Sequence, residues 1–264
     1  MARVPSLHAQ TPVAPAAHSD TAKPGPLFSG RDALIGAVFV GTTVAMLPLD
    51  KRLARHLTNT GAQENRFYRD AAHGLEVFTS PGAYYIGGSM YLIGRVGRFE
   101  RLADLGWHGT EAVLVADGIT LLLKGLSGRS RPFVSSDTSP GDFKLARGFS
   151  SGDRQSFPSG HATTAFAAAS AVTAETARWW PKSVWVVAPA MYGGATLVGL
   201  SRMYHNKHWA SDVVLGAAIG TFSGRKVVQY SHVHKTAIDR VILHTTIAPT
   251  GGGDVVVAWN WSVP

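Results

Sequence analysis

The chain has 264 residues, no cysteine and a net charge of +8 at pH 7, with an isoelectric point near 9.9. The absence of cysteine excludes a disulfide framework, thiolate metal sites and a thiol nucleophile. The 25 lysines and arginines are scattered, without a run of five or six and without a nucleic-acid-binding motif, so their charge favours a phosphate substrate or an anionic membrane surface over nucleic acid.

Residues 1–30 are rich in Ala, Pro, His and Ser and lack the apolar core of a signal peptide, so we expect a disordered N-terminal segment. Residues 7–12 look like the end of a cleavage region, which leaves open a start of translation further upstream. The rest of the pattern predicts one helical domain at residues 31–226, a size that a single domain commonly reaches. Residues 227–264 are expected to form a β-rich tail.

Six apolar stretches predict a bundle of six helices. They are residues 33–47, 83–94, 111–123, 161–177, 184–200 and 212–222. Each is shorter than, or barely equal to, the ~20 residues that a membrane-spanning helix requires, and Asp117 and Glu175 interrupt two of them. Gly216, Gly220 and Gly224 recur at intervals of four, which lets helix backbones approach closely in membranes and in tight soluble bundles. We expect a membrane-embedded bundle, with a soluble bundle as the alternative.

The C-terminal tail has the pattern of a β-hairpin. Two β-rich runs, residues 241–248 and 255–261, flank the turn-forming residues 249–253. Four large apolar residues alternate onto one face of the second run: Val255, Val257, Trp259 and Trp261. We expect this face to pack against the helical bundle of the same chain.

Three short clusters carry residues suited to phosphate chemistry. They are Lys124 with Arg131-Pro132, the run Pro158-Ser159-Gly160-His161, and Ser201-Arg202 with His208 and Asp212. Together they supply three fixed cations, the N-terminus of a helix and two histidines, which a pocket needs to hold a tetrahedral oxyanion and displace a group from it. Residues 133–157 have turn chemistry and no periodicity, which predicts a loop over the mouth of this pocket.

His208 and Asp212 are four residues apart, so on a helix they share one face and can touch. Asp212 can accept the proton of one ring nitrogen of His208, which fixes the tautomer and leaves the other nitrogen to attack phosphorus. Such a pair alone is more often a structural hydrogen bond. The two neighbouring clusters favour the catalytic interpretation.

The run at 158–161 precedes an alanine-rich helix. Ser159 can cap this helix so that the amides of its first turn face the pocket, and Gly160 allows close approach of the backbone to a phosphate oxygen. His161 is placed to protonate a departing alkoxide and later to take a proton from water.

Lys124, Arg131 and Arg202 are expected to hold the non-bridging oxygens and to stabilise the transition state without a metal. His205 and His208 have a spacing that suits zinc, but no acidic or cysteine ligand is arranged with them, so we expect no metal site there. Four other residues are expected to stand outside the site: Arg129 as a surface cation, and His73, His108 and His205, which lack a partner pattern.

The joint pattern closely resembles the three-part signature of the type 2 phosphatidic acid phosphatase (PAP2) superfamily, which also contains bacterial acid phosphatases and vanadium haloperoxidases. No signature position departs from it, and the resemblance covers residues 121–212 directly. The resemblance implies an all-α, six-helix PAP2-type bundle with the short β-hairpin-like tail appended. It also implies that His208 is the nucleophile that becomes phosphorylated and that His161 is the general acid.

The leading hypothesis is a metal-independent phosphatase that acts on a phosphate monoester or diphosphate, expected to be that of a lipid, and needs no cofactor. The alternatives are a soluble envelope acid phosphatase and a haloperoxidase in which vanadate fills the phosphate site with His208 as its axial ligand. A non-catalytic scaffold is disfavoured because His161, His208 and Asp212 are all intact. We expect a bacterial-type cell envelope location with the site facing outward, to the periplasm. The sequence leaves the substrate and the oligomeric state open.

Overall fold

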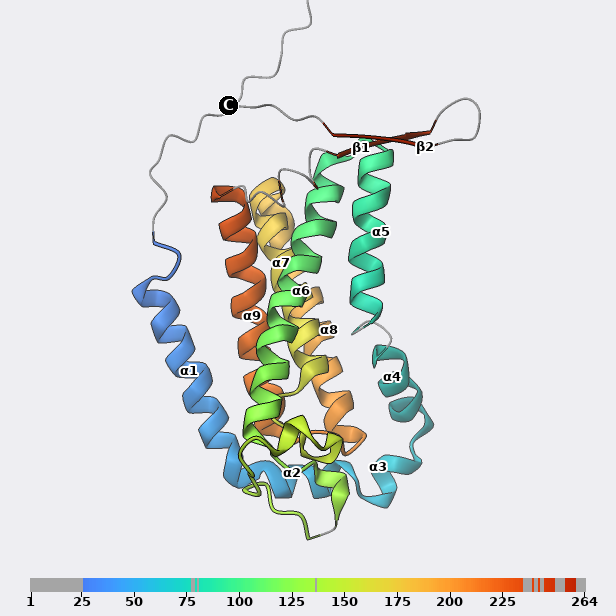
Figure 1. The fold of residues 1–264 in the computed structure, drawn as a ribbon. Coiled ribbons are helices and arrows are strands. Elements are labelled where there is room, and N and C mark those ends of the chain that lie inside the picture. Colours follow the sequence, from blue (N-terminus) through green and yellow to red (C-terminus); the bar gives the residue numbers. More distant parts are fainter. Residues whose placement is uncertain are drawn as a thin grey trace, which may run out of the picture.

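The computed structural model describes residues 26–76, 79, 81–135, 137–234, 239, 242, 245–249 and 255–259. Within these residues, six long helices lie side by side along roughly the same axis (Figure 1), and the predicted helical bundle is confirmed. The long helices are α1 (Gly30–Met46), α5 (Gly82–Val96), α6 (Glu100–Ser127), α7 (Gly160–Trp179), α8 (Val184–Tyr204) and α9 (Ala210–Val233).

Shorter elements connect the long helices. Between α1 and α5 lie the 3-10 turn η1 (Leu47–Leu49) and the helices α2 (Asp50–Leu57), α3 (Thr60–Glu64) and α4 (Arg66–Glu76). Four further 3-10 turns follow: η2 (Pro132–Val134), η3 (Arg147–Phe149), η4 (Gly152–Arg154) and η5 (Pro181–Ser183). The expected loop at 133–157 thus contains three of these turns and no longer element among its described residues.

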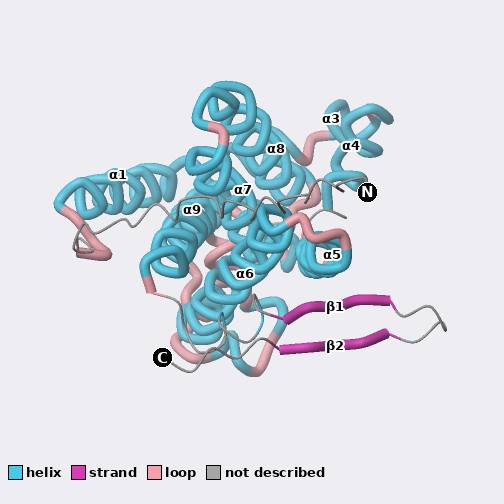
Figure 2. The backbone as a smooth tube through the Cα atoms, turned by 90° about the horizontal axis from the view of Figure 1, so that it is seen from above, coloured by secondary structure: helices cyan, strands magenta, loops and turns pink. Residues whose placement is uncertain are grey.

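Helix α7 lies in the middle of the bundle, against α6, α8 and α9, while α1 and α5 flank the outside (Figure 2). The glycine row of α9 explains the closeness of α7 and α9. A Cβ atom on Gly216, Gly220 or Gly224 would lie 2.6, 2.3 or 2.5 Å from a carbonyl oxygen of α7 or its N-cap. Real Cβ atoms do not approach so closely. The four-residue spacing of the glycines therefore matches the spacing of the carbonyl groups that they face on α7.

The bundle has small and polar side chains inside and large apolar side chains outside. Its buried residues are mainly Ala, Ser and Thr, whereas Trp185 and Leu34 are 85% and 66% exposed. Two segments, Gly30–Leu57 and Pro181–Tyr204, are long and apolar enough to cross a membrane, and only 11% and 17% of the residues in their most apolar windows are buried. Burial within the protein therefore does not account for the apolar character of these two segments.

The helices extend beyond the apolar runs that predicted them, because those runs mark only their apolar parts. Helix α6 begins at Glu100 and ends at Ser127, and the next residue, Gly128, adopts the left-handed conformation that favours glycine at such ends. Helix α9 continues to Val233, past the expected domain boundary at residue 226. Lys226 lies inside this helix and is buried, and its Nζ donates to Asp32 Oδ2 at 2.7 Å.

The C-terminal hairpin is confirmed. Strand β1 (Thr245–Pro249) pairs antiparallel with β2 (Val255–Trp259), while residues 250–254 and Trp261 lie outside the described residues. The hairpin is attached to the end of α5, where Arg95 Nε donates to the Thr245 carbonyl at 2.7 Å. Val257, part of the face expected to pack on the bundle, is 46% exposed. The contact shown here is therefore a hydrogen bond to the strand backbone, and at Val257 the expected apolar packing is incomplete.

The α7–α9 contact generates a stability prediction. Gly220→Ala places a methyl group 2.3 Å from the Thr163 carbonyl oxygen, so we expect a loss of about 1–3 kcal/mol from overpacking. Gly118→Ala on α6 is the matched control, because no atom lies within 4 Å of its added methyl group and alanine favours helix by about 1 kcal/mol over glycine. Chemical unfolding of both variants would show the difference, and equal stabilities would contradict the close contact.

Candidate active site

The three sequence clusters meet at one end of the bundle, beside α2 and the loop between α6 and α7 (Figure 1). Because α6, α7, α8 and α9 alternate in direction, the ends of α6 and α8 lie beside the starts of α7 and α9. Lys124 lies in the last turn of α6 and Arg202 in the last turn of α8. Ser159, Gly160 and His161 begin α7, and His208 and Asp212 flank the start of α9.

His208 is held as a neutral ring with one free nitrogen. Its side chain is only 2% exposed, and burial lowers the pKa of His208 to about 3. Its Nδ1 lies 2.7 Å from the backbone carbonyl oxygen of Ser156 and 3.5 Å from Asp212 Oδ2. A carbonyl oxygen only accepts hydrogen bonds, so Nδ1 carries the hydrogen and Nε2 keeps its lone pair.

The nearest acceptor for His208 therefore differs from the one that the sequence predicted. Asp212 was expected to accept the hydrogen of one ring nitrogen, and the structure places the Ser156 carbonyl oxygen nearer to Nδ1. The Asp212 carboxylate instead accepts from Ser156 Oγ at 2.5 Å and from the Trp209 amide at 2.8 Å. Asp212 thus connects the loop after α6, through Ser156, to the start of α9, through Trp209.

Arg129 is the largest departure from the sequence analysis. It was expected to be a surface cation, yet its side chain is 0% exposed. Its Nη1 donates to Asp212 Oδ1 at 2.5 Å, its Nη2 to Asp50 Oδ2 at 2.7 Å and its Nε to the Pro140 carbonyl at 2.8 Å. The expectation was wrong because two carboxylates from distant segments enclose this guanidinium. Three aromatic rings lie within 5.7 Å of it, those of Phe143, Phe157 and Trp209.

Asp50, at the start of α2, is the second residue that the sequence analysis missed. Besides Arg129, its carboxylate accepts from the Ser211 amide at 2.9 Å and from Ser211 Oγ at 2.5 Å. These bonds fasten α2 to the N-terminus of α9. No local spacing signals this pairing, because 161 residues separate Asp50 from Ser211.

The cations that were predicted to bind phosphate surround the same place. Lys124 Nζ donates to the Gln155 carbonyl at 2.7 Å, and Arg131 Nε donates to the Gly152 carbonyl at 3.1 Å. Burial and the neighbouring guanidinium of Arg202 lower the pKa of Arg131. Like charges gathered in this way favour the binding of an anion between them.

The start of α7 lies against these cations. A Cβ atom on Gly160 would be 3.5 Å from Lys124 Cε, so the backbone at the start of α7 lies next to the Lys124 side chain. Ser159 is at the N-cap position, but its side chain does not make the capping hydrogen bond that the sequence predicted. Its Oγ is buried, and it has no hydrogen-bond partner within the described residues. His161, the second residue of α7, is half-buried.

The histidines expected to be bystanders fall into two groups. The rings of His73 and His205 lie 4.8 Å apart, and His205 follows the last turn of α8. His108 lies near the other end of the bundle, so it takes no part in this site, but the expectation that it lacks a partner was wrong. Its Nδ1 is 2.6 Å from Glu175 Oε1, an acidic residue that the sequence analysis noted only as an interruption of a helix.

Comparison with known proteins agrees with the sequence signature. Residues 106–235 match the family model described as the PAP2 superfamily. A 69-residue segment is 45% identical to lipid A 1-phosphatase of Porphyromonas gingivalis (strain ATCC 33277), and it covers 26% of this chain and 15% of that protein. The matched segment thus spans less than a sixth of the curated relative.

Two solved structures resemble the fold. The crystal structure of Aquifex aeolicus LpxE has a TM-score of 0.48 and 20% identity, over 69% of this chain and 96% of that one. The first transmembrane PAP2 type phosphatidylglycerolphosphate phosphatase from Bacillus subtilis has a TM-score of 0.34 and 18% identity, over 72% of this chain and 96% of that one.

The buried network around Arg129 generates the second prediction. Asp50→Ala leaves part of a buried guanidinium without its counter-charge, so we expect a loss of about 3–5 kcal/mol in unfolding free energy. Asp70→Ala is the control, because Asp70 and its neighbour Arg69 are exposed and such pairs contribute about 0–1 kcal/mol. Unfolding in denaturant measures both, and a loss below about 1 kcal/mol for Asp50→Ala would refute the structural importance of the network.

Proposed function

Because the chain belongs to the PAP2 superfamily, we propose that it is a metal-independent phosphatase that hydrolyses a phosphate monoester or diphosphate of a lipid. The observation that carries this proposal is the state of His208. The ring is neutral, its Nδ1 hydrogen is fixed by the Ser156 carbonyl, and its Nε2 lone pair is left for attack. A ring in this state, next to a cluster of cations, is suited to nucleophilic displacement at phosphorus.

The reaction would proceed in two displacements. The Nε2 atom of His208 attacks phosphorus, the nitrogen–phosphorus bond forms, and the bond to the ester oxygen breaks while His161 donates a proton to that oxygen. Water then attacks the phosphohistidine and gives a proton to His161, and the nitrogen–phosphorus bond breaks to release inorganic phosphate. Lys124, Arg131 and Arg202 would neutralise the equatorial oxygens in both transition states.

Asp212 and Ser156 would act on the nucleophile rather than on phosphate. When Nε2 bonds to phosphorus, the ring becomes cationic, and the Asp212 carboxylate at 3.5 Å from Nδ1 can stabilise that charge. The Ser156 carbonyl keeps the ring oriented. The buried Ser159 hydroxyl, which has no partner within the described residues, is available to a phosphate oxygen.

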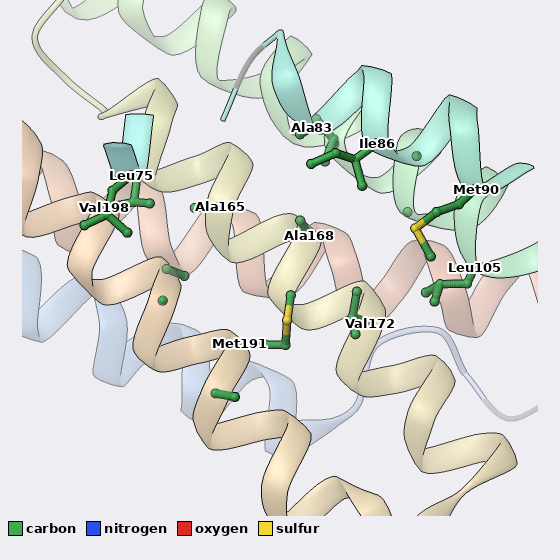
Figure 3. A pocket seen from close by; sticks show the side chains of 16 residues that line it. Leu75, Ala83, Ile86, Met90, Leu105, Ala165, Ala168, Val172, Met191 and Val198 are labelled. Atoms are coloured by element: carbon green, nitrogen blue, oxygen red, sulfur yellow. The ribbon is translucent and has the colours of Figure 1, made fainter. Parts of the chain in front are cut away.

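A lipid substrate is supported by the apolar parts of the molecule. A cavity of about 400 Å³ lies between α5, α6, α7 and α8, and Figure 3 shows side chains such as Ile86, Met90, Ala168 and Met191 around it. All sixteen residues that line the cavity are apolar or glycine. Such a cavity favours an alkyl chain over water or a polar group.

The location of the protein is part of the same proposal. The exposed apolar helix surfaces suit a bilayer, so we place the bundle in a cell-envelope membrane with its catalytic end facing outward. The similarity to a lipid A 1-phosphatase makes a phosphorylated glycolipid the first substrate to test.

The nucleophile assignment can be tested directly. We expect His208→Ala to lower phosphate release from a lipid phosphate by ~10³-fold or more, because the covalent intermediate cannot form. His73→Ala, an exposed histidine outside the cation cluster, should retain activity. Rapid quenching with radiolabelled substrate should trap a base-stable phosphoenzyme in the His73 variant and none in the His208 variant.

More than a tenth of normal activity in folded His208→Ala would overturn the assignment of His208 as nucleophile. Full loss of activity after brief chelation would overturn metal independence.

The lipid assignment can be tested by chain length. A membrane-embedded protein should resist a carbonate wash, and it should prefer a long-chain lipid phosphate over its short-chain analogue by at least about tenfold, since each buried methylene contributes ~0.8 kcal/mol. Ala168→Phe fills the cavity and should reduce this preference with little effect on the short analogue. Val186→Phe, at an exposed position of α8, is the control. Release by carbonate together with flat chain-length kinetics would favour a soluble acid phosphatase instead.

A further inference from the structure

A second cluster of titratable side chains lies at the end of the bundle opposite the catalytic site. It contains His108 of α6, Glu175 of α7 and His232 of α9. His108 and Lys124 are 16 residues apart on α6, so about 24 Å separates the two sites at ~1.5 Å per residue. The proposed phosphatase reaction uses none of these three residues.

The three side chains converge on one carboxylate. His108 Nδ1 lies 2.6 Å from Glu175 Oε1, and His232 Nε2 lies 2.9 Å from each oxygen of Glu175. The side chains of His108 and Glu175 are 2% and 1% exposed, and that of His232 is 15% exposed. One nitrogen of each ring and one carboxylate oxygen all lie within 4.8 Å of one another, so a single ion can reach all three.

One atom of the cluster lacks a partner. His108 Nε2 is buried and makes no hydrogen bond within the described residues. Buried ring nitrogens are rarely left in this state. A neutral imidazole offers one donor and one acceptor, and the contact with Glu175 occupies only the Nδ1 side. A bound cation, or a water molecule coordinated to it, would supply the missing partner.

The surroundings of the cluster are acidic. Asp104, one turn before His108, interacts electrostatically with all three residues of the cluster. Asp239 and Glu111 lie near His108 as well. Trp107 Nε1 donates a hydrogen bond to Asp239 Oδ1 at 2.8 Å. Four carboxylates thus surround two imidazoles, and this balance of charge favours a divalent cation.

We propose that His108, Glu175 and His232 bind a divalent transition-metal ion of the zinc class. Two imidazoles and one carboxylate are a donor set that zinc accepts with a water molecule as fourth ligand. The ion would join the start of α6 to the ends of α7 and α9, at the end away from phosphate hydrolysis. Its role would be to hold the three central helices together, which stabilises the folded chain by mass action.

The experiment uses the full chain, purified without a histidine tag and stripped of metal. Cobalt(II) is the probe, because coordination by two imidazoles and a carboxylate gives visible absorption bands. We expect one equivalent of cobalt to bind, to raise the melting temperature and to be displaced by zinc. Glu175→Gln and His232→Asn should each weaken cobalt binding by at least about tenfold, the lower range for disturbed metal sites.

The control is His205→Asn, which removes the other close histidine pair and should leave cobalt binding unchanged. His232→Asn serves where Glu175→Gln does not fold, since His232 is the most exposed member of the cluster. Absence of cobalt bands in the wild type, or equal affinity in the cluster variants, would overturn the proposal and leave a metal-free hydrogen-bonded triad. The readout is spectroscopic, so its failure leaves the phosphatase proposal unaffected.

Discussion

The ion pairs that Arg129 makes with Asp50 and Asp212 are the interactions on which the catalytic end depends. A guanidinium removed from water needs counter-charge and a full set of acceptors, and Arg129 has two carboxylates, a hydroxyl group and a carbonyl group. These partners come from α2, from the loop after α6 and from the start of α9. One charged group therefore sets the relative positions of three segments, and the loss of either carboxylate would remove an ion pair and an acceptor from a buried guanidinium.

This arrangement separates cations that build the site from cations that can bind a substrate. Arg129 is saturated by protein acceptors and is 0% exposed, so it can contribute little to a ligand. Lys124 and Arg131 are half-buried and donate to backbone carbonyl groups, which carry no full negative charge. Their positive charge therefore has no hydrogen-bonded carboxylate among the described residues, as our proposal requires of cations that bind an anion. Arg129 and Arg131 are only two residues apart in sequence, but Arg129 is fully buried whereas Arg131 is half-buried.

The sequence predicted those features that depend on local spacing. Periodic apolar runs predicted the long helices, because each helix needs one such run. The glycines of α9 at four-residue intervals predicted a close contact between helices, and the structure shows that the partner is α7. The sequence missed the features that depend on distant pairing. Asp50 lies 79 residues from Arg129, and Ser156 holds His208 through a carbonyl group, which every residue possesses. No pattern of residue types could identify that carbonyl in advance.

The same topology that assembles the catalytic end also creates the second cluster. Helices that alternate in direction bring the starts of α7 and α9 to one end, so their last turns must meet at the other, beside the start of α6. Between the two ends, the glycines of α9 touch the backbone of α7, which leaves no space for one helix to shift against the other without losing these contacts. A cation bound by Glu175 and His232 would therefore stabilise the same helix pair that carries Ser159 and Asp212. The two ends are thus connected by two helices in direct contact along their length.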